Sequence, residues 1–288
     1  MSYQSVLRPG LFEGQTIIVT GGGSGIGRCT AHELASLGAR VALVGRKVEK
    51  VEAVKAEILD DGGVASAHVC DIREEASVKA TVQAIIEEHG GLHAVVNNAG
   101  GQFPSPLTGI NQKGWETVVR TNLTGGFLMA REAYTQALSK TGGAIVNIVA
   151  DMWGGMPGMG HSGAARAGMV NFTQTAAYEW GHSGVRVNAV APGWIASSGM
   201  DNYPESMREW IRNLANFVPI KRMGTEAEIS SAICFLLSPG AAFINGDCLR
   251  IDGGASQGSP IWPLPNAKNN APYNGFHRSA TPKVLSDS

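Results

Sequence analysis

The chain has 288 residues, of which 43% are hydrophobic and 16% charged, so it holds enough apolar material to bury a large core. Glycine accounts for 38 residues without a Gly-X-Y repeat, and only 13 residues are proline, which excludes a collagen-like or Pro-rich disordered chain. The net charge is −1 and no run of basic residues occurs, so no nucleic-acid partner is expected.

Short apolar, β-branched segments recur along the chain and predict buried strands. They lie at Thr16–Thr20, Val41–Val44, Ala65–Cys70, Leu92–Asn97, Ala144–Val149, Val185–Val190 and Cys248–Asp252. Amphipathic stretches between them predict helices at Ile26–Leu37, Val48–Leu59, Glu74–Glu88, Lys113–Ser139, Gly163–Gly181 and Glu226–Leu237. Strict alternation of strand and helix predicts an α/β fold, a single-domain Rossmann-type doubly wound parallel seven-stranded sheet.

The expected domain boundaries follow from this order of elements. Residues 1–12 form an N-terminal lead, and residues 13–255 a dinucleotide-binding catalytic domain. Residues 197–218 mix polar and aromatic side chains between the sixth strand and the last helix, where a substrate lid would lie. Residues 256–288 carry several prolines and few apolar residues, so an extended tail is expected, and its docking on a neighbouring subunit stays open.

Targeting and metal-binding signals are missing from the sequence. The N-terminal MSYQSVLRPGLFEG lacks the apolar stretch of a signal peptide, the terminal VLSDS is not a peroxisomal address, and no run of ~18 apolar residues suggests a membrane span. The four cysteines form no Cys-x-x-Cys pair, and no metal site is expected from the seven histidines. We therefore expect reduced thiols, no metal and a cytoplasmic protein.

A glycine-rich loop, TGGGSGIG at residues 20–27, joins the first strand to the first helix. A pyrophosphate must approach backbone N–H groups at a helix N-terminus, and a Cβ would block it. Because a strand precedes the loop and a helix follows it, the loop predicts dinucleotide binding. The candidate cofactor-binding residues here are Gly21, Gly23, Ser24, Gly25, Ile26 and Gly27.

The end of the second strand indicates which nicotinamide nucleotide binds. NAD-specific folds place Asp or Glu there to bind the ribose 2′-hydroxyl, but this chain has Gly45 followed by Arg46 and Lys47. No carboxylate repels a 2′-phosphate, and Arg46 can bind one with two hydrogen bonds. The sequence therefore predicts NADP(H), with Arg46 and Lys47 as candidate contacts.

The chain resembles the short-chain dehydrogenase/reductase family over most of residues 10–255. The shared motifs are TGGGSGIG (20–27), CDI (70–72), NNAG (97–100), Asn122 in RTNLTG, and APGWI (191–195). The resemblance implies that Asp71 and Ile72 meet the adenine, that Asn98, Ala99 and Gly100 run beside the ribose, and that Pro192, Gly193 and Ile195 border the nicotinamide. It also implies that Asn122 holds a catalytic water or a substrate oxygen. Homo-oligomers formed through the helices at Lys113–Ser139 and Gly163–Gly181 are expected by the same resemblance.

A closer likeness is to peroxisomal-type trans-2-enoyl-CoA reductases and to 2,4-dienoyl-CoA reductases. It rests on NNAGGQFPSPL (97–107), NLTGGF (122–127), HSGAARAG (161–168) and CFLLSPGAAFINGD (234–247). One feature departs from most of the family, which uses Ser and Tyr-x-x-x-Lys in catalysis. Aligned on Ala165–Gly168, the Lys position holds Arg166 and the Tyr position holds Ser162.

This departure bears on the reaction. Arginine is permanently protonated and a serine hydroxyl is a poor acid, so oxidation of an alcohol lacks its usual proton carrier. Reduction of an enoyl thioester instead develops charge on the thioester oxygen, which oriented donors can stabilise. The candidate catalytic residues are Asn122, Ser162, Arg166 and Asp151, with Arg166 also a candidate cofactor contact. Two structural alternatives are left open: Ser162 as a helix cap and Asp151 as a solvated loop residue. A catalytic role for Tyr203 is also left open.

The sequence therefore favours an NADP(H)-dependent oxidoreductase that reduces the 2,3 double bond of an enoyl-CoA thioester. Two alternatives remain. The first is a dehydrogenase or reductase of an alcohol, ketone or 3-hydroxyacyl-CoA in lipid or terpenoid catabolism. The second is a catalytically inactive nucleotide-binding homologue.

Overall fold

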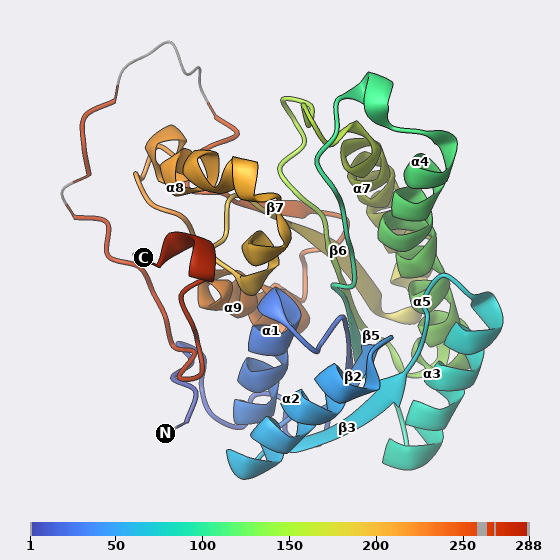
Figure 1. The fold of residues 1–288 in the computed structure, drawn as a ribbon. Coiled ribbons are helices and arrows are strands. Elements are labelled where there is room, and N and C mark those ends of the chain that lie inside the picture. The colour runs from blue at the N-terminus through green and yellow to red at the C-terminus, as the bar shows by residue number, and fades with distance from the viewer. Residues whose placement is uncertain (1, 258–263, 268, 287–288) are drawn as a thin grey trace.

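The computed structural model describes residues 2–257, 264–267 and 269–286. Within them, seven strands form one parallel sheet in the order β3-β2-β1-β4-β5-β6-β7. The strands are β1 (Thr16–Thr20), β2 (Arg40–Gly45), β3 (Val64–Val69), β4 (Ala94–Asn97), β5 (Gly143–Ile148), β6 (Val185–Pro192) and β7 (Cys248–Ile251). The predicted single-domain, doubly wound Rossmann-type fold is confirmed (Figure 1).

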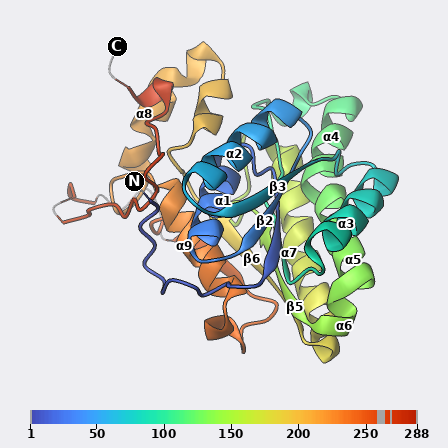
Figure 2. The same ribbon diagram turned by 90° about the horizontal axis from the view of Figure 1, so that it is seen from below.

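Helices cover both faces of the sheet (Figure 2). One face carries α1 (Gly25–Ser36), α2 (Val48–Asp60) and α9 (Glu226–Leu237), and the other carries α3 (Glu75–His89), α4 (Gln112–Val119), α5 (Gly125–Ala133), α6 (Ser139–Thr141) and α7 (Gly160–Trp180). Side chains of a strand alternate between the two cores: Ile17 and Val19 belong to one cluster and Ile18 to the other. This explains why the strands are apolar throughout instead of alternating.

The strand order reverses between β1 and β4, because the chain moves outward from β1 to β3 and then returns to β4 on the other side of β1. The loops that leave the carboxyl ends of β1 and β4 therefore diverge to opposite faces and leave a crevice. The glycine-rich loop and the NNAG segment lie at this place, so the topology alone brings two of the predicted motifs together.

The long helix expected over Lys113–Ser139 is helical but not uniformly α. It starts at Gln112, where the side chain of Asn111 accepts a hydrogen bond from the N–H of Gly114 at 2.8 Å. Two π-helical turns, Arg120–Thr124 and Tyr134–Leu138, interrupt it. Such turns are rare in proteins, and those that occur often lie at functional sites. The first of them contains Asn122.

The lid-like segment is folded rather than irregular. It consists of the short 3₁₀ turns Ser198–Asn202 and Glu205–Met207 and the helix α8 (Arg208–Phe217). A small cluster of buried side chains holds it together: Met200, Ile211, Leu214 and Val284. The ring of Trp194, just after β6, meets that of Trp210 edge to face at 5.1 Å and joins this cluster to the sheet.

The described part of the C-terminal tail docks on its own chain, which the sequence alone did not predict (Figure 1). Phe276 is buried against Tyr3 of the N-terminal lead, and Arg278 donates to Asp61 at the end of α2. Farther on, the Val284 N–H donates to Asp201 and the Val284 carbonyl accepts from Arg212 in α8. A few anchors of this kind hold an otherwise polar, proline-rich segment against the domain and against the lid.

In the described part of the chain, no helix combines the length and apolar character that a bilayer crossing requires.

Candidate functional site

The glycine-rich loop has the shape of a phosphate cradle. Gly21 and Gly25 have φ angles of +65° and +57°, which side chains rarely adopt. A Cβ on Gly21 would lie 3.0 Å from the Cα of Ala99, and one on Gly27 would lie 2.5 Å from the carbonyl oxygen of Gly21. The loop therefore keeps backbone free at the start of α1, where an anion is favoured.

Thr20 and Asn98 fasten this loop to β4. The Thr20 hydroxyl accepts hydrogen bonds from the backbone N–H groups of Asn98 (3.0 Å) and Ala99 (2.9 Å). The Asn98 side chain donates to the carbonyls of Thr20 (2.9 Å) and Gly21 (3.3 Å). Asn98, expected beside the ribose, thus also braces the phosphate loop.

A carboxyl group lies beside the loop. Glu226 begins α9, and its Oε1 would be 3.8 Å from a Cβ on Gly25. Burial raises the pKa of Glu226 to about 7, so a large fraction of this carboxyl is neutral at pH 7. A neutral group avoids the repulsion that a carboxylate would impose on a bound pyrophosphate.

A cavity of about 300 Å³ opens from the loop along the switch point. Nine of the expected cofactor contacts line it: Gly21, Ser24, Ile26, Arg46, Asp71, Ile72, Asn98, Ala99 and Gly100. Six other lining residues were not among the expected contacts: Val44, Gly45, Cys70, Arg73, Thr121 and Ser197. The remaining expected contacts do not line it: Gly23, Gly25, Gly27, Lys47, Arg166, Pro192, Gly193 and Ile195.

These remaining residues have structural surroundings of their own. A Cβ on Gly23 would meet Lys50 at 2.8 Å, and Lys47 precedes α2 as its N-cap residue without a side-chain cap. A Cβ on Gly193 would lie 2.7 Å from the Cα of Asp252, so that glycine permits β6 and the loop after β7 to approach closely. Pro192 ends β6, and Ile195 lines a separate cavity.

Two arginines and one carboxylate line the 300 Å³ cavity: Arg46, Arg73 and Asp71. Arg73 binds Asp71 with its Nε at 2.9 Å, and this pairing holds the pKa of Asp71 at about 2. Because Arg73 neutralises that carboxylate, Arg46 is left to act on a ligand from the same cavity. The position of Arg73, two residues after Asp71, is visible in the sequence. A solvated arginine near the start of a helix has the same sequence pattern, so the pattern alone did not identify the ion pair.

The expected catalytic residues Asn122 and Ser162 lie together. Both are buried, and Asn122 Nδ2 is 3.4 Å from Ser162 Oγ. Asn122 also accepts from the N–H of Gly101 at 2.8 Å and donates to its carbonyl at 2.9 Å. Ser162 Oγ donates to Gln102 Oε1 at 2.7 Å. Sequence reasoning did not identify Gln102 as a residue of the site.

Ser162 is not a helix cap. The helix α7 begins at Gly160, with Met159 as N-cap, so Ser162 lies inside the first turn, and its hydroxyl bonds to Gln102. The boundary expected at Gly163 was wrong because His161 and Ser162 follow a glycine-rich run that resembles loop. His161 is buried against the Phe103 ring (4.4 Å), and its Nε2 has no partner among the described residues.

Arg166 lies one turn after Ser162 and carries the least compensated charge of the site. Its Nη1 donates to the Ile148 carbonyl at 2.6 Å, while its buried Nε has no hydrogen-bond partner in the described chain. A Cβ on Gly100 would be 2.5 Å from Arg166 Nη2, so the guanidinium lies against the segment after β4 where a cofactor contact is expected. Burial lowers its pKa to about 10, and it stays charged at pH 7.

Asp151 stands apart from these three residues. Its backbone N–H donates to the Pro192 carbonyl at 3.2 Å, and no described hydrogen bond joins it to Asn122, Ser162 or Arg166. Burial and the nearby Asp252 raise its pKa. Arg250, which opposes that rise, lies over the Trp153 ring at 3.9 Å.

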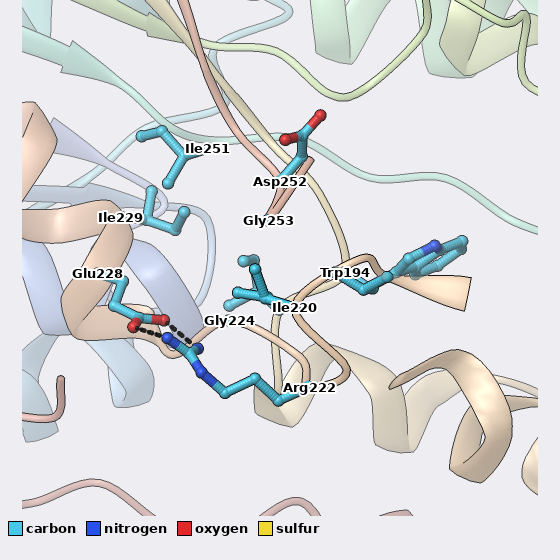
Figure 3. Close-up of a pocket in the computed structure, with 11 residues that line it drawn as sticks. Trp194, Ile220, Arg222, Gly224, Glu228, Ile229, Ile251, Asp252 and Gly253 are labelled. Carbon is cyan, nitrogen blue, oxygen red and sulfur yellow. Dashed lines mark hydrogen bonds and ion pairs between the residues drawn. The ribbon is translucent and has the colours of Figure 1, made fainter. Parts of the chain in front are cut away.

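A second cavity of about 240 Å³ lies behind the end of β6 and shares no lining residue with the first. Figure 3 shows isoleucines 220, 229 and 251 around it, with Arg222 extended toward Glu228 at one end. Two hydrogen bonds, of 2.9 and 2.6 Å, join the Arg222 guanidinium to the Glu228 carboxylate. Since Arg222 is the only basic one among the described residues that line this cavity, and it is paired with Glu228, no free cation is left there for a cofactor phosphate.

A metal-like grouping occurs elsewhere, at the edge of the sheet. Ligand atoms of His68, Glu88 and His89 lie within 4.8 Å of one another, which the spacing of histidines in the sequence did not indicate. Both imidazoles hydrogen bond to Ser66 Oγ at 2.8 Å. These bonds account for the grouping without an ion. The four cysteines are free, as expected.

Comparisons with known proteins agree with this geometry. A family model described as Enoyl-(Acyl carrier protein) reductase matches residues 21–256. A probable 2,4-dienoyl-CoA reductase of Bacillus subtilis is 37% identical over 246 residues, covering 84% of this chain and 96% of that protein. The expected likeness to dienoyl-CoA reductases is thereby confirmed.

Solved structures show the same fold. The citronellol catabolism dehydrogenase of Pseudomonas aeruginosa PAO1 is 65% identical, with a TM-score of 0.80, covering 88% of this chain and all of that one. A variant of actinorhodin polyketide ketoreductase, solved with NADPH, is 28% identical with a TM-score of 0.79, covering 87% of this chain and 100% of that one.

Proposed function

Because the chain belongs to the short-chain dehydrogenase/reductase family, we propose that it is an NADP(H)-dependent oxidoreductase that reduces the 2,3 double bond of an enoyl-CoA thioester. The likeness to a dienoyl-CoA reductase supports an unsaturated acyl thioester as substrate. The single observation that carries the proposal is the half-buried Arg166 cation, which has no carboxylate partner in the described chain.

Arg166 suits a reaction in which negative charge develops on an oxygen. The Arg166 Nη2, which a Cβ on Gly100 would approach to 2.5 Å, has no hydrogen-bond partner in the described chain, so it can donate to a ligand. A guanidinium donates hydrogen bonds without releasing its proton, which stabilises an enolate oxygen of a thioester. A bound reduced nicotinamide supplies the hydride for such a reduction. Asn122 and Ser162 are the further candidate donors to the substrate.

The residues present fit a dinucleotide. The glycine-rich loop is suited to the pyrophosphate, because a Cβ at Gly21 or Gly27 would fill the space there. The 300 Å³ cavity, lined by Arg46 and Gly100 among others, is suited to the adenosine half. NADPH bound to a structural relative supports the choice of nucleotide. We assign the 2′-phosphate to Arg46, since no acidic residue follows Gly45.

Arg46→Ala is expected to weaken NADPH binding about tenfold and to leave NADH binding unchanged, because an exposed charge-assisted contact contributes in the range of ~1.5 kcal/mol. Titration of nucleotide fluorescence measures both affinities. Lys47→Ala is the matched control, since Lys47 does not line the cavity, and a smaller effect is expected there. Tighter binding of NADH than of NADPH by the unmodified protein would contradict the assignment.

The experiment that tests the function follows NADPH oxidation at 340 nm with trans-2-enoyl-CoA thioesters of increasing chain length. Turnover at some length is expected. A sample that binds NADPH yet oxidises it with none of these thioesters would overturn the proposal.

A second candidate function is supported by the 65% identical structure, that of the citronellol catabolism dehydrogenase of Pseudomonas aeruginosa PAO1. Under this reading, the chain oxidises an alcohol or reduces a carbonyl in terpenoid catabolism. NADP⁺ reduction with citronellol, measured beside the thioester assay, separates the two: the better substrate is the one with the higher kcat/KM. If both assays fail while NADPH binds, a catalytically inactive nucleotide-binding role is favoured.

We also propose a homo-oligomer. Exposed aromatic side chains lie on the helices that the resemblance assigns to subunit contacts: Trp115 on α4, Phe127 on α5 and Tyr178 on α7. Large exposed apolar groups on neighbouring elements are typical of protein interfaces.

A further inference from the structure

A hydrogen-bond chain begins at the backbone of Gly101 and runs through the candidate site. Asn122 Oδ1 accepts from the N–H of Gly101 at 2.8 Å, and Asn122 Nδ2 donates to the Gly101 carbonyl at 2.9 Å. A backbone N–H is always a donor and a carbonyl always an acceptor. The orientation of the Asn122 amide is therefore set by the backbone.

The direction of every later bond follows from this start. Asn122 Nδ2 also donates to Ser162 Oγ at 3.4 Å, so the Ser162 hydrogen is left for Gln102 Oε1, at 2.7 Å. With its oxygen engaged, Gln102 presents its Nε2, which donates to the hydroxyl oxygen of Tyr203 at 3.1 Å.

The chain ends on the O–H of Tyr203. Because that oxygen accepts from Gln102, its own hydrogen is free, and the acceptor that faces it is Met159 Sδ at 3.8 Å, a weak one. Amides and a serine hydroxyl are poor proton donors, whereas tyrosine is among the side chains that act as general acids. The most acidic proton of the chain thus lies at its open end.

Tyr203 belongs to the lid-like insertion, between its two 3₁₀ turns, and packs against the buried lid cluster of Met200, Ile211, Leu214 and Val284. Gln102 lies on the exposed loop that follows β4. The Gln102–Tyr203 contact spans 101 positions of sequence and connects the lid with the carboxyl edge of the sheet.

We propose that Tyr203 is the proton donor of the reaction and that Gln102 is its positioning residue. This rests on the proposed enoyl reduction. A hydride from the reduced nicotinamide forms the new C–H bond at C3, and the C2=C3 electron pair moves toward C2 and the thioester oxygen. The Tyr203 O–H bond breaks, its proton bonds to C2, and water returns a proton to the tyrosinate. The net uptake is one hydride and one proton from solvent.

The kinetic test compares three variants in the thioester assay. Tyr203→Phe is expected to lower kcat about 100-fold or more while the NADPH dissociation constant is unchanged. Gln102→Leu is expected to lower kcat less and to shift the alkaline limb of the kcat–pH profile, which Tyr203→Phe abolishes. Tyr273→Phe is the control, since the Tyr273 hydroxyl donates to the Gln4 carbonyl at 2.7 Å, away from the candidate site. A Tyr203→Phe enzyme within twofold of the parent overturns the proposal.

A second measurement does not need turnover. The chain has five tyrosines, so 3-fluorotyrosine labelling yields five ¹⁹F resonances, and Tyr203→Phe identifies the one of interest. We expect it to shift on Gln102→Leu and on addition of NADP⁺ with crotonyl-CoA, a pair that cannot react. A resonance that moves with neither change refutes the role of Tyr203. Failure of all thioester turnover with these shifts intact contradicts only the enoyl-reductase proposal.

Discussion

Replacing Arg166 by methionine is expected to lower kcat/KM by about 100-fold or more, because loss of one oriented donor to a developing oxyanion costs ~3 kcal/mol. The same change is expected to leave the free energy of unfolding within about 1 kcal/mol of the parent, or to raise it. The Arg166 guanidinium is half-buried, with one carbonyl partner and no carboxylate in the described chain, and such a charge opposes folding. Activity and stability are therefore expected to change in different directions.

Arg186 offers a matched control. It too is a partly buried arginine whose pKa is lowered by burial, but its guanidinium donates to the carbonyls of Leu236, Leu237 and Ser238 at the end of α9. Arg186→Met is expected to cost about 2 kcal/mol of stability, since buried carbonyls lose their donors, and to leave kcat/KM per folded molecule unchanged. Urea unfolding and the thioester assay measure both quantities. An Arg166→Met protein that is active but unstable would show that Arg166 is a structural residue.

Replacing Gly27 by alanine is expected to weaken NADPH binding by about 100-fold, equivalent to two lost charge-assisted hydrogen bonds of ~1.5 kcal/mol each. Alanine favours a helix over glycine by ~1 kcal/mol, but its Cβ would lie 2.5 Å from the Gly21 carbonyl oxygen and also against Asn98 Nδ2. Overpacking of this kind costs ~1–3 kcal/mol, so the steric term wins and displaces the phosphate loop.

Nucleotide fluorescence measures the affinity, and urea unfolding measures the accompanying loss of stability, for which about 1 kcal/mol is expected. Gly91→Ala is the control, because the nearest atom to its Cβ is His93 Cε1 at 3.7 Å, an ordinary contact. Binding of NADPH to the Gly27→Ala protein with the parent affinity would show that the loop does not hold the pyrophosphate.

The strands and most helices could be read from the sequence because each is a local pattern. An apolar run such as Thr16–Thr20 has to be buried on both faces, and only a central parallel strand achieves this. The glycine-rich loop could also be predicted from the sequence. A φ of +65° at Gly21 and the close approach of the Gly21 carbonyl to Gly27 require residues without a Cβ.

Where local signals conflict, sequence reasoning placed boundaries wrongly. The glycine-rich stretch before Ser162 resembles a loop, yet α7 already starts at Gly160. Tertiary packing decides here, since His161 and Ser162 are both buried in that first turn. The same limit applies to the tail, where a single buried aromatic, Phe276, with ion pairs at Arg278, outweighs a composition typical of disorder.

By itself, the sequence determined the doubly wound sheet, the phosphate loop and the absence of a Tyr-x-x-x-Lys motif at Ser162 and Arg166. The tertiary structure alone decided that Arg166 is a half-buried cation without a counter-charge in the described chain and that Gln102 connects Ser162 with Tyr203. The physical reason is range. Backbone conformation and burial repeat with a period of a few residues, whereas a hydrogen bond between residues 102 and 203 leaves no periodic trace and exists only once the lid has packed against the sheet.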